Sequence, residues 1–263
     1  AEKYYAESQS LARLSNVEFV MVASAIGVAI AKGSQGNLTE ALEVLEDILK
    51  SHPDCAHALY NKGVVLGALQ RHKDALTAYE EATRFRPTWV QAWNNKGAML
   101  GRLDRNGEAL VAFDQATKLD PSYAMAWNNM GTALVTLGRH EEALSAFNQA
   151  IGLNSRYVSA WGNKGNTLDE LGRYKEALAA YDEALRLDPE WAMIWNNEGA
   201  ALSQLRRFDE ALAAYEKAIE LYPKYDLAWM NKGRILGSQG RYEQALAAYG
   251  EVIRIDPDSA EAW

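Results

Sequence analysis

The chain has 263 residues, of which 48% are hydrophobic and 24% are charged, and this ordinary balance excludes extended disorder. A formal net charge of −8 argues against a nucleic-acid partner, because phosphate backbones are bound by clustered Lys and Arg. The single Cys55 excludes an internal disulfide framework, so no oxidising compartment is needed and we expect a cytoplasmic protein.

Four residue types return every 34 positions along most of the chain. The repeated glycines are Gly63, Gly97, Gly131, Gly165, Gly199 and Gly233. The repeated tryptophans are Trp93, Trp127, Trp161, Trp195, Trp229 and Trp263, and an Ala-Leu pair and a proline keep the same step. We number each unit from 1 to 34, with units beginning at residues 22, 56, 90, 124, 158, 192 and 226. The sequence is therefore a tandem array.

Each unit is predicted to hold two amphipathic helices. Apolar or small residues recur at positions 4, 8 and 11, and again at positions 20, 21, 24, 27 and 28, which is helical spacing. Gly138, Gly172 and Gly240 at position 15 suit a left-handed helix end, and proline at position 32 follows the second helix. One such helix pair cannot bury its apolar face alone, so the units are expected to stack.

These residues resemble the tetratricopeptide repeat (TPR), whose pattern is an aromatic at 4, Gly at 8, Ala at 20, an aromatic at 24, Ala at 27 and Pro at 32. The resemblance covers residues 22–259 and is most specific for the last six units. It implies an all-α fold, an α-solenoid of stacked helix-turn-helix repeats that form a right-handed superhelix.

In chain order, residues 1–21 are expected to form either a capping helix or the remnant of a truncated repeat. Residues 22–55 are a degenerate TPR, 56–259 are six regular repeats, and 260–263 begin a further one. No polar cap follows Trp263, so we expect a fragment of a longer protein or an end that packs on another molecule. The uncharged stretch 19–31 is shorter than the roughly 20 apolar residues that span a bilayer, so membrane insertion is not expected.

No motif of catalysis or cofactor binding is found, so the chain is interpreted as a non-enzyme without a cofactor. His52, Cys55 and His57 lie close in sequence, but a fourth zinc ligand is missing and a solvated turn is the favoured interpretation. No metal site is therefore predicted.

Two basic positions also repeat. The position-16 arginines are expected to bind helix-end carbonyls or adjacent carboxylates: Arg71, Arg105, Arg139, Arg173, Arg207 and Arg241. The position-7 lysines are expected to lie along apolar helix surface and not to contact a ligand: Lys62, Lys96, Lys164 and Lys232.

Asparagine is repeated inside the first helices, although its amide competes with the helix backbone. Position 6 holds Asn61, Asn95, Asn129, Asn163, Asn197 and Asn231. Position 5 adds Asn94, Asn128 and Asn196, and position 9 of one unit holds Asn166. In the family that the chain resembles, positions 2, 5, 6, 9, 12 and 13 line a concave groove. Over the six regular units only four of these positions are charged: Arg102, Asp169, Glu170 and Arg234.

The position-6 series is similar to that of the TPR arrays of O-linked N-acetylglucosamine transferases, which hold substrate polypeptide. The carboxylate clamp of chaperone adaptors is the other family mode, and it is interpreted as absent because Gly162, Leu227 and Asn231 stand where its cations belong. Each amide can donate to and accept from a main chain. The ten asparagines are thus predicted to bind an extended peptide from a protein partner.

Three alternatives stay open at this point. The asparagines could bind one another, water or nearby backbone without any ligand. The chain could be a structural scaffold that forms a homo-oligomer through its uncapped ends. It could also position substrate for a larger enzyme.

Overall fold

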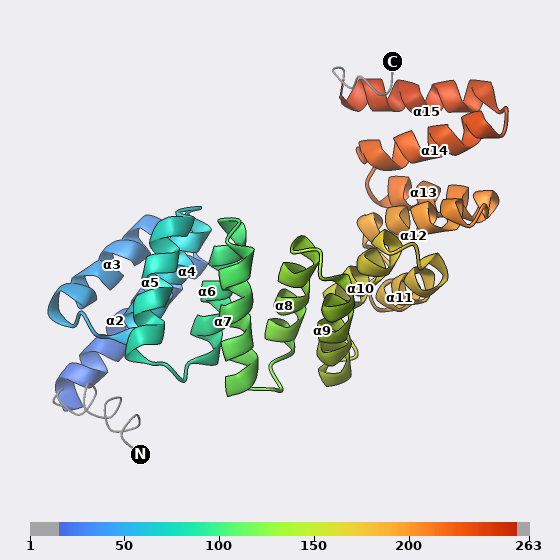
Figure 1. Cartoon of the computed structure of the whole chain (residues 1–263). Helices are drawn as coiled ribbons and strands as arrows, with labels where there is room; N and C mark the ends of the chain where they lie inside the picture. Colours follow the sequence, from blue (N-terminus) through green and yellow to red (C-terminus); the bar gives the residue numbers. More distant parts are fainter. Residues whose placement is uncertain (1–15, 257–263) are drawn as a thin grey trace. The chain divides into compact units, whose positions relative to one another are not determined.

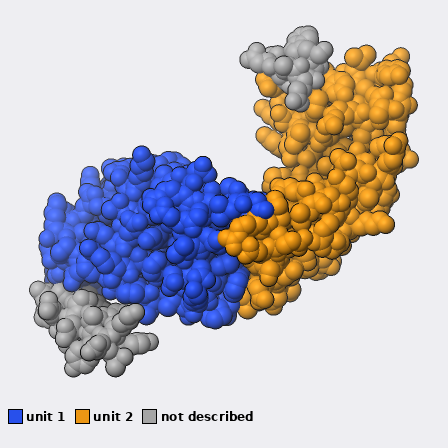
Figure 2. Space-filling view, in the orientation of Figure 1, with its two compact units in different colours: residues 1–138 blue, residues 139–263 orange. Residues whose placement is uncertain are grey.

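The computed structural model describes residues 16–256, and Figure 1 shows a succession of helices over this range. The chain divides into two compact units, residues 1–138 and 139–263, which are coloured separately in Figure 2. The helices of the first unit are α2 (Asn16–Ser34), α3 (Leu38–Ser51), α4 (Ala56–Ala68), α5 (His72–Phe85), α6 (Val90–Arg102), α7 (Asn106–Leu119) and α8 (Ala124–Thr136). The helices of the second unit are α9 (His140–Leu153), α10 (Val158–Glu170), α11 (Tyr174–Leu187), α12 (Ala192–Gln204), α13 (Phe208–Leu221), α14 (Asp226–Ser238) and α15 (Tyr242–Ile255).

This arrangement confirms the predicted all-α repeat fold, and residues 16–256 contain no strand. From α4 onward, first helices occupy positions 1–13 of the repeat and second helices occupy positions 17–30. Helix α2 begins six residues before Val22, so residues 16–21 continue into the first helix of the first repeat. Residues 1–15 and 260–263, on which the expected cap or remnant and the further repeat depend, lie outside the described residues. The handedness of the superhelix stays a prediction.

The turn inside each repeat has one geometry whatever residue fills it. The predicted glycines Gly138, Gly172 and Gly240 have φ of 72°, 71° and 74°. Gln70, Asp104 and Arg206 occupy the same position with φ of 60°, 57° and 60°. In a left-handed turn of this kind, the N–H after the turn residue reaches a carbonyl five residues back, as in Arg207 N to Leu202 O at 3.0 Å. The hydrogen bond, and not the glycine, therefore defines the turn.

Position 8 is glycine because the ring at position 24 lies against it. A Cβ on Gly165 would lie 2.4 Å from Cε1 of Tyr181, and one on Gly199 would lie 2.7 Å from Cε1 of Tyr215. Both distances are shorter than any van der Waals contact, so a side chain at position 8 would displace the aromatic ring. The two helices of a repeat approach closely for this reason.

The position-4 tryptophans close the turn between consecutive repeats. Each Nε1 donates a hydrogen bond to the main-chain carbonyl of position 32, six residues earlier, at 2.8–3.1 Å. The donors are Trp93, Trp127, Trp161, Trp195 and Trp229. We call this contact the indole clamp. It satisfies a main-chain carbonyl in the turn that follows the second helix.

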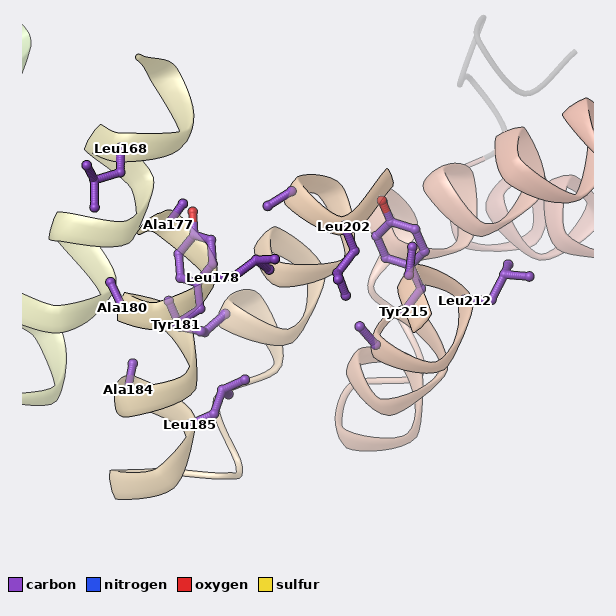
Figure 3. Close-up of a cluster of buried hydrophobic side chains, with 14 of the residues drawn as sticks. Leu168, Ala177, Leu178, Ala180, Tyr181, Ala184, Leu185, Leu202, Leu212 and Tyr215 are labelled. Carbon is purple, nitrogen blue, oxygen red and sulfur yellow. The ribbon is translucent and has the colours of Figure 1, made fainter. Parts of the chain in front are cut away.

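The core of each unit consists of clusters of small and large buried side chains. In the second unit, Ala177, Ala184 and Ala211 are fully buried beside Tyr181 and Tyr215, as Figure 3 shows for one part of this cluster. In the first unit, a similar cluster surrounds Leu45, Leu66 and Tyr79. Alanine admits close helix approach and the rings fill the remaining space, so the packing is that of a solenoid with no central core.

Candidate functional site

In the first unit, the predicted asparagines form hydrogen bonds with one another from repeat to repeat. Asn129 Nδ2 donates to Asn94 Oδ1 at 3.0 Å, which links α8 to α6. Asn94 Nδ2 donates to Asn95 Oδ1 at 3.2 Å, and Asn95 Nδ2 donates to the hydroxyl of Tyr60 on α4 at 3.1 Å. Asn128 Nδ2 in turn donates to Asn129 Oδ1 at 3.3 Å. We call this chain of amide contacts the asparagine ladder.

The second unit repeats the ladder with one change. Asn231 Nδ2 donates to Asn196 Oδ1 at 3.0 Å, and Asn196 Nδ2 donates to Asn197 Oδ1 at 3.2 Å, as in the first unit. Asn197 Nδ2, however, donates to Asn166 Oδ1 at 2.9 Å, four positions further along the preceding first helix than the usual acceptor. The hydroxyl of Tyr181 donates to the same oxygen at 2.9 Å.

Gly162 explains the change, because it stands where the other repeats place the position-5 acceptor. A Cβ there would lie 2.9 Å from Cδ1 of Ile194 and 3.4 Å from the ring of Trp191, so apolar atoms fill the space of the absent amide. Asn166, one helical turn further on, takes over as acceptor. Asn166 thus belongs to the ladder, although the sequence argument placed it only by its position in the groove.

Burial separates the two asparagine positions. Asn94, Asn128 and Asn196 at position 5 are 2%, 6% and 2% exposed, whereas the position-6 asparagines and Asn166 are half-buried. The buried amides hold the half-buried ones in place. Asn61 differs, because its Nδ2 donates to the main-chain carbonyl of His57 in its own helix at 2.8 Å. Asn163 is half-buried on α10.

An aromatic group lies at the α4 end of the ladder. The ring of Tyr60 stacks on Trp89 at 4.5 Å between centroids, and His57 lies 4.7 Å from the same ring. Arg86 covers Trp89 at 5.0 Å. Burial raises the pKa of Tyr60, and burial followed by the proximity of Tyr60 raises that of Tyr79. Both hydroxyls therefore stay protonated and neutral beside Asn95.

The four charged groove positions include one half-buried carboxylate. Burial first, and then the charge of Glu170, raises the pKa of Asp169 above its ordinary value. Its Oδ1 is buried and accepts no hydrogen bond from residues 16–256. Burial raises the pKa of the Tyr215 hydroxyl to about 12, and the charge of nearby Arg234 opposes this rise.

The position-16 arginines bind adjacent carboxylates as predicted, whereas the position-7 lysines form ion pairs that were not predicted. Five of the six position-16 arginines pair with the carboxylate three residues later, as in Arg105 with Glu108 and Arg139 with Glu142, both at 2.7 Å, whereas Arg241 donates to the amide oxygen of Gln244. This confirms the expected adjacent carboxylates. The position-7 lysines do more than lie along the helix, because Lys232 is 2.8 Å from Glu216 of the preceding repeat. The sequence interpretation missed this pair, although Lys and Glu stand 16 residues apart in several repeats.

Within the described residues, no group of three His, Cys, Asp or Glu side chains is placed to hold a metal ion. None of the helices in residues 16–256 has the length and apolarity to cross a bilayer. The expected homo-oligomer and the expected cytoplasmic location stay predictions.

The fold and the site together define a helical repeat array with an internal amide ladder. The sequence profile of the tetratricopeptide repeat family matches residues 29–88, 95–158, 128–192 and 196–260, which is more than half of the chain. The chain belongs to the tetratricopeptide repeat family, whose members generally mediate protein–protein interaction. No curated protein matches the sequence.

Solved structures show the same fold. YrrB, described as a TPR protein with an unusual peptide-binding site, is 24% identical with a TM-score of 0.59, over 71% of this chain and 96% of that one. The C-terminal part of a TPR protein from Cytophaga hutchinsonii is 17% identical with a TM-score of 0.71, over 90% and 97%. A chain of the APC/C hetero-tetramer Cut9–Hcn1 is 16% identical with a TM-score of 0.72, over 89% and 46%. At these identities the likeness concerns the fold alone.

Proposed function

We propose that the chain is a non-catalytic scaffold that binds an extended polypeptide along the half-buried side of its asparagine ladder. The observation that carries this proposal is that the asparagines at positions 5 and 6 of the repeat have different roles. Buried amides at position 5 orient half-buried amides at position 6, and the latter keep hydrogen-bonding capacity toward solvent.

The capacity of each amide can be counted. An asparagine side chain has two N–H donors and two acceptor lone pairs. Asn197 uses one donor on Asn166 and one lone pair on the Asn196 amide. One N–H and one lone pair are thus left for a main-chain carbonyl and N–H of a peptide. Asn129 has the same capacity, with one donor on Asn94 and one lone pair on the Asn128 amide. This pattern favours recognition of backbone over side chains.

Pre-orientation supports binding as well as stability. An amide that is already fixed by its neighbours loses little side-chain entropy when a ligand arrives. The low charge of the predicted groove positions, with only Arg102 in the first unit, adds little selection by peptide charge. The peptide-binding site of YrrB, a protein of the same fold, supports a peptide ligand for this chain.

The test uses a peptide selected from a random unstructured library against the whole chain. Asn197 and Asn231 are replaced together by Ala, and the dissociation constant of the peptide is measured by fluorescence anisotropy. We expect binding to weaken by at least about tenfold, since each replacement removes a donor and an acceptor offered to the ligand and a neutral hydrogen bond is worth about 0.5–1.5 kcal/mol.

The matched control is Asn148→Ala, which removes an exposed amide from the second helix α9 and should leave the affinity unchanged. Circular dichroism confirms that both variants keep their helices. If the double variant binds as tightly as the wild type, the ladder serves only the contact between repeats and the proposal is wrong.

A further inference from the structure

A recurring contact between consecutive repeats shows that the fold itself builds an ammonium site. The Nζ of Lys62, Lys96 and Lys232 at position 7 lies 3.1, 3.7 and 2.8 Å from a glutamate at position 25 of the preceding repeat. The same ammonium lies over the position-4 ring where Lys96 meets Trp93 at 5.2 Å and Lys232 meets Trp229 at 5.5 Å. A carboxylate and an indole face together favour a cation.

One repeat carries the opposite charge at this place. Glu198 stands at position 7 of the repeat that begins at Ala192, and Asp182 stands at position 25 of the repeat before it. Both line a cavity of about 530 Å³ between α11, α12 and α13, together with Trp195, Arg207 and Lys217. We call it the Glu198 pocket. It holds an indole and three carboxylates, those of Asp182, Glu198 and Glu210, and its position 7 is not a lysine, as it is at Lys62, Lys96, Lys164 and Lys232 in four other repeats.

The next pair of repeats provides an internal comparison. The Lys232 pocket is the equivalent cavity, of about 430 Å³, with Glu216, Trp229, Lys232 and Arg241 in its lining. Each of its lining residues stands 34 positions after one of the Glu198 pocket. The cavity is therefore smaller where the lysine of the chain itself enters it.

The two cations that line the Glu198 pocket are paired with glutamates other than Glu198. Arg207 lies 2.6 Å from Glu210, and Lys217 lies 2.9 Å from Glu220. The Oε2 of Glu198 is buried and finds no hydrogen-bond donor among residues 16–256. Burial first, and then the charge of Asp182 and a side-chain hydrogen bond with it, raise the pKa of Glu198 to about 7, while the charge of Arg207 opposes this rise. A buried acceptor without a donor is costly, so the pocket gains free energy when a cation enters.

We propose that the Glu198 pocket binds a primary alkylammonium group from outside the chain, held by the carboxylates of Asp182 and Glu198 against the face of Trp195. The group occupies the position that the ammonium of Lys232 occupies in the Lys232 pocket. Its alkyl stem lies along the apolar wall that Leu178 and Leu202 provide. A primary alkylammonium group ends the lysine side chain of a partner polypeptide and also occurs in a free alkyl amine.

This site is separate from the asparagine ladder. None of its lining residues stands at position 2, 5, 6, 9, 12 or 13 of a repeat. Failure of the peptide proposal therefore leaves this one intact, and the reverse is also true.

The test titrates the whole chain with butylammonium at pH 8, where Glu198 is ionised, and follows its side-chain carboxyl carbon by NMR. Sodium chloride at equal ionic strength is the reference, because it screens charge without the alkyl stem. We expect a saturable shift in millimolar butylammonium and none with sodium. Binding should weaken as the pH falls through 7, because Glu198 then takes up a proton.

Two substitutions form a matched pair. Glu198→Lys places the ammonium of the chain itself in the pocket and should weaken butylammonium binding about tenfold or more, while the helices are retained. Lys232→Glu should create a second site of the same kind, which Trp229 Nε1 reports by its own chemical shift. Unchanged saturable binding in Glu198→Lys, or a folded Lys232→Glu chain without a second site, would overturn the proposal.

Two further probes identify the source of the ammonium. A blocked peptide with one central lysine and free pentanediamine are titrated in the same way. Tighter binding of the peptide than of butylammonium assigns the pocket to a partner polypeptide. Tighter binding of the diamine assigns it to a free amine. If neither these probes nor butylammonium saturates the shift, the pocket is not an ammonium site.

Discussion

The Glu198 pocket and the Lys232 pocket are two copies of one contact between repeats, and they differ mainly in charge. Both have two leucines, an indole and a pair of alanines at the same places, so the packing between repeats is the same. One copy pairs Lys232 with Glu216, whereas the other opposes Glu198 to Asp182. The comparison teaches that apolar packing sets the stacking of the repeats, and that the charged position can diverge without loss of the fold.

The largest expected effect comes from removing the part that the two pockets share. Trp195→Ala and Trp229→Ala each remove an indole clamp, with Nε1 to carbonyl distances of 2.8 and 3.1 Å, and a half-buried ring. We expect each to destabilise its contact by about 3 kcal/mol. Native-state hydrogen exchange of the α12 and α14 amides measures both, and costs that differ by more than ~1 kcal/mol would show that the packing is not equivalent.

The next largest effect is a pH dependence of stability, which we expect near the Glu198 pocket and not near the Lys232 pocket. Because the folded-state pKa of Glu198 is raised from 4.5 to about 7, the folded chain holds a proton that the unfolded chain releases. The stability of the α12–α13 region is therefore greatest below pH 4.5 as far as this group is concerned, falls as the pH rises toward 7, and is lowest above it. Since solvent screens this partly exposed group, we expect a fall of about 1–2 kcal/mol.

Glu198→Gln should remove this dependence, because an amide does not titrate. Exchange rates of α14, next to the Lys232 pocket, provide the internal reference and should not show the same fall. A wild-type chain whose α12 protection stays constant between pH 5 and 8 would contradict the pH prediction.

A smaller effect is expected when the charges are interchanged. At pH 8, Glu198→Lys should stabilise its contact by ~1 kcal/mol through a new pair with Asp182. Lys232→Glu should destabilise the other contact by a similar amount, since Glu216 would then face a like charge. Urea unfolding of both variants measures the two changes, and equal signs would show that charge is irrelevant to this contact.

The smallest effect concerns the turns that lead into the two second helices. Arg206 has φ of 60° where Gly240 has φ of 74°, so the first turn holds a side chain in a conformation that favours glycine. Arg206→Gly should stabilise the chain by about 0.5–1 kcal/mol, and Gly240→Ala should destabilise it by a similar amount. Thermal unfolding measures both changes, and a lower melting temperature for Arg206→Gly would indicate that the arginine side chain stabilises its turn.

Most of the fold could be predicted from the sequence, because a period of 34 residues leaves little choice of helix position. The predicted left-handed glycines are confirmed. The left-handed Gln70, Asp104 and Arg206 were not predicted, since glycine alone signals that conformation in a sequence. The signal that could have found them is position 15 of the repeat, where Gly138, Gly172 and Gly240 stand in other repeats.

The site could be predicted only in part. The repetition of asparagine indicated that these residues matter, but a sequence does not show which amides pair across repeats. Position 5 is buried and position 6 half-buried because a helix turns by about 100° per residue, so neighbouring asparagines face different surroundings. The transfer from position 5 to Asn166 depends on Ile194 filling the space at Gly162, which only coordinates reveal.

The indole clamp has a spectroscopic consequence. Each ring belongs to one repeat and donates to the carbonyl that ends the repeat before it, so its emission reports whether two neighbours are still docked. In a linear array that melts from one end, a ring loses its acceptor when the adjacent repeat frays, before its own helices unwind. A set of chains that each keep a single one of these tryptophans would therefore locate the boundary between melted and folded repeats as denaturation proceeds.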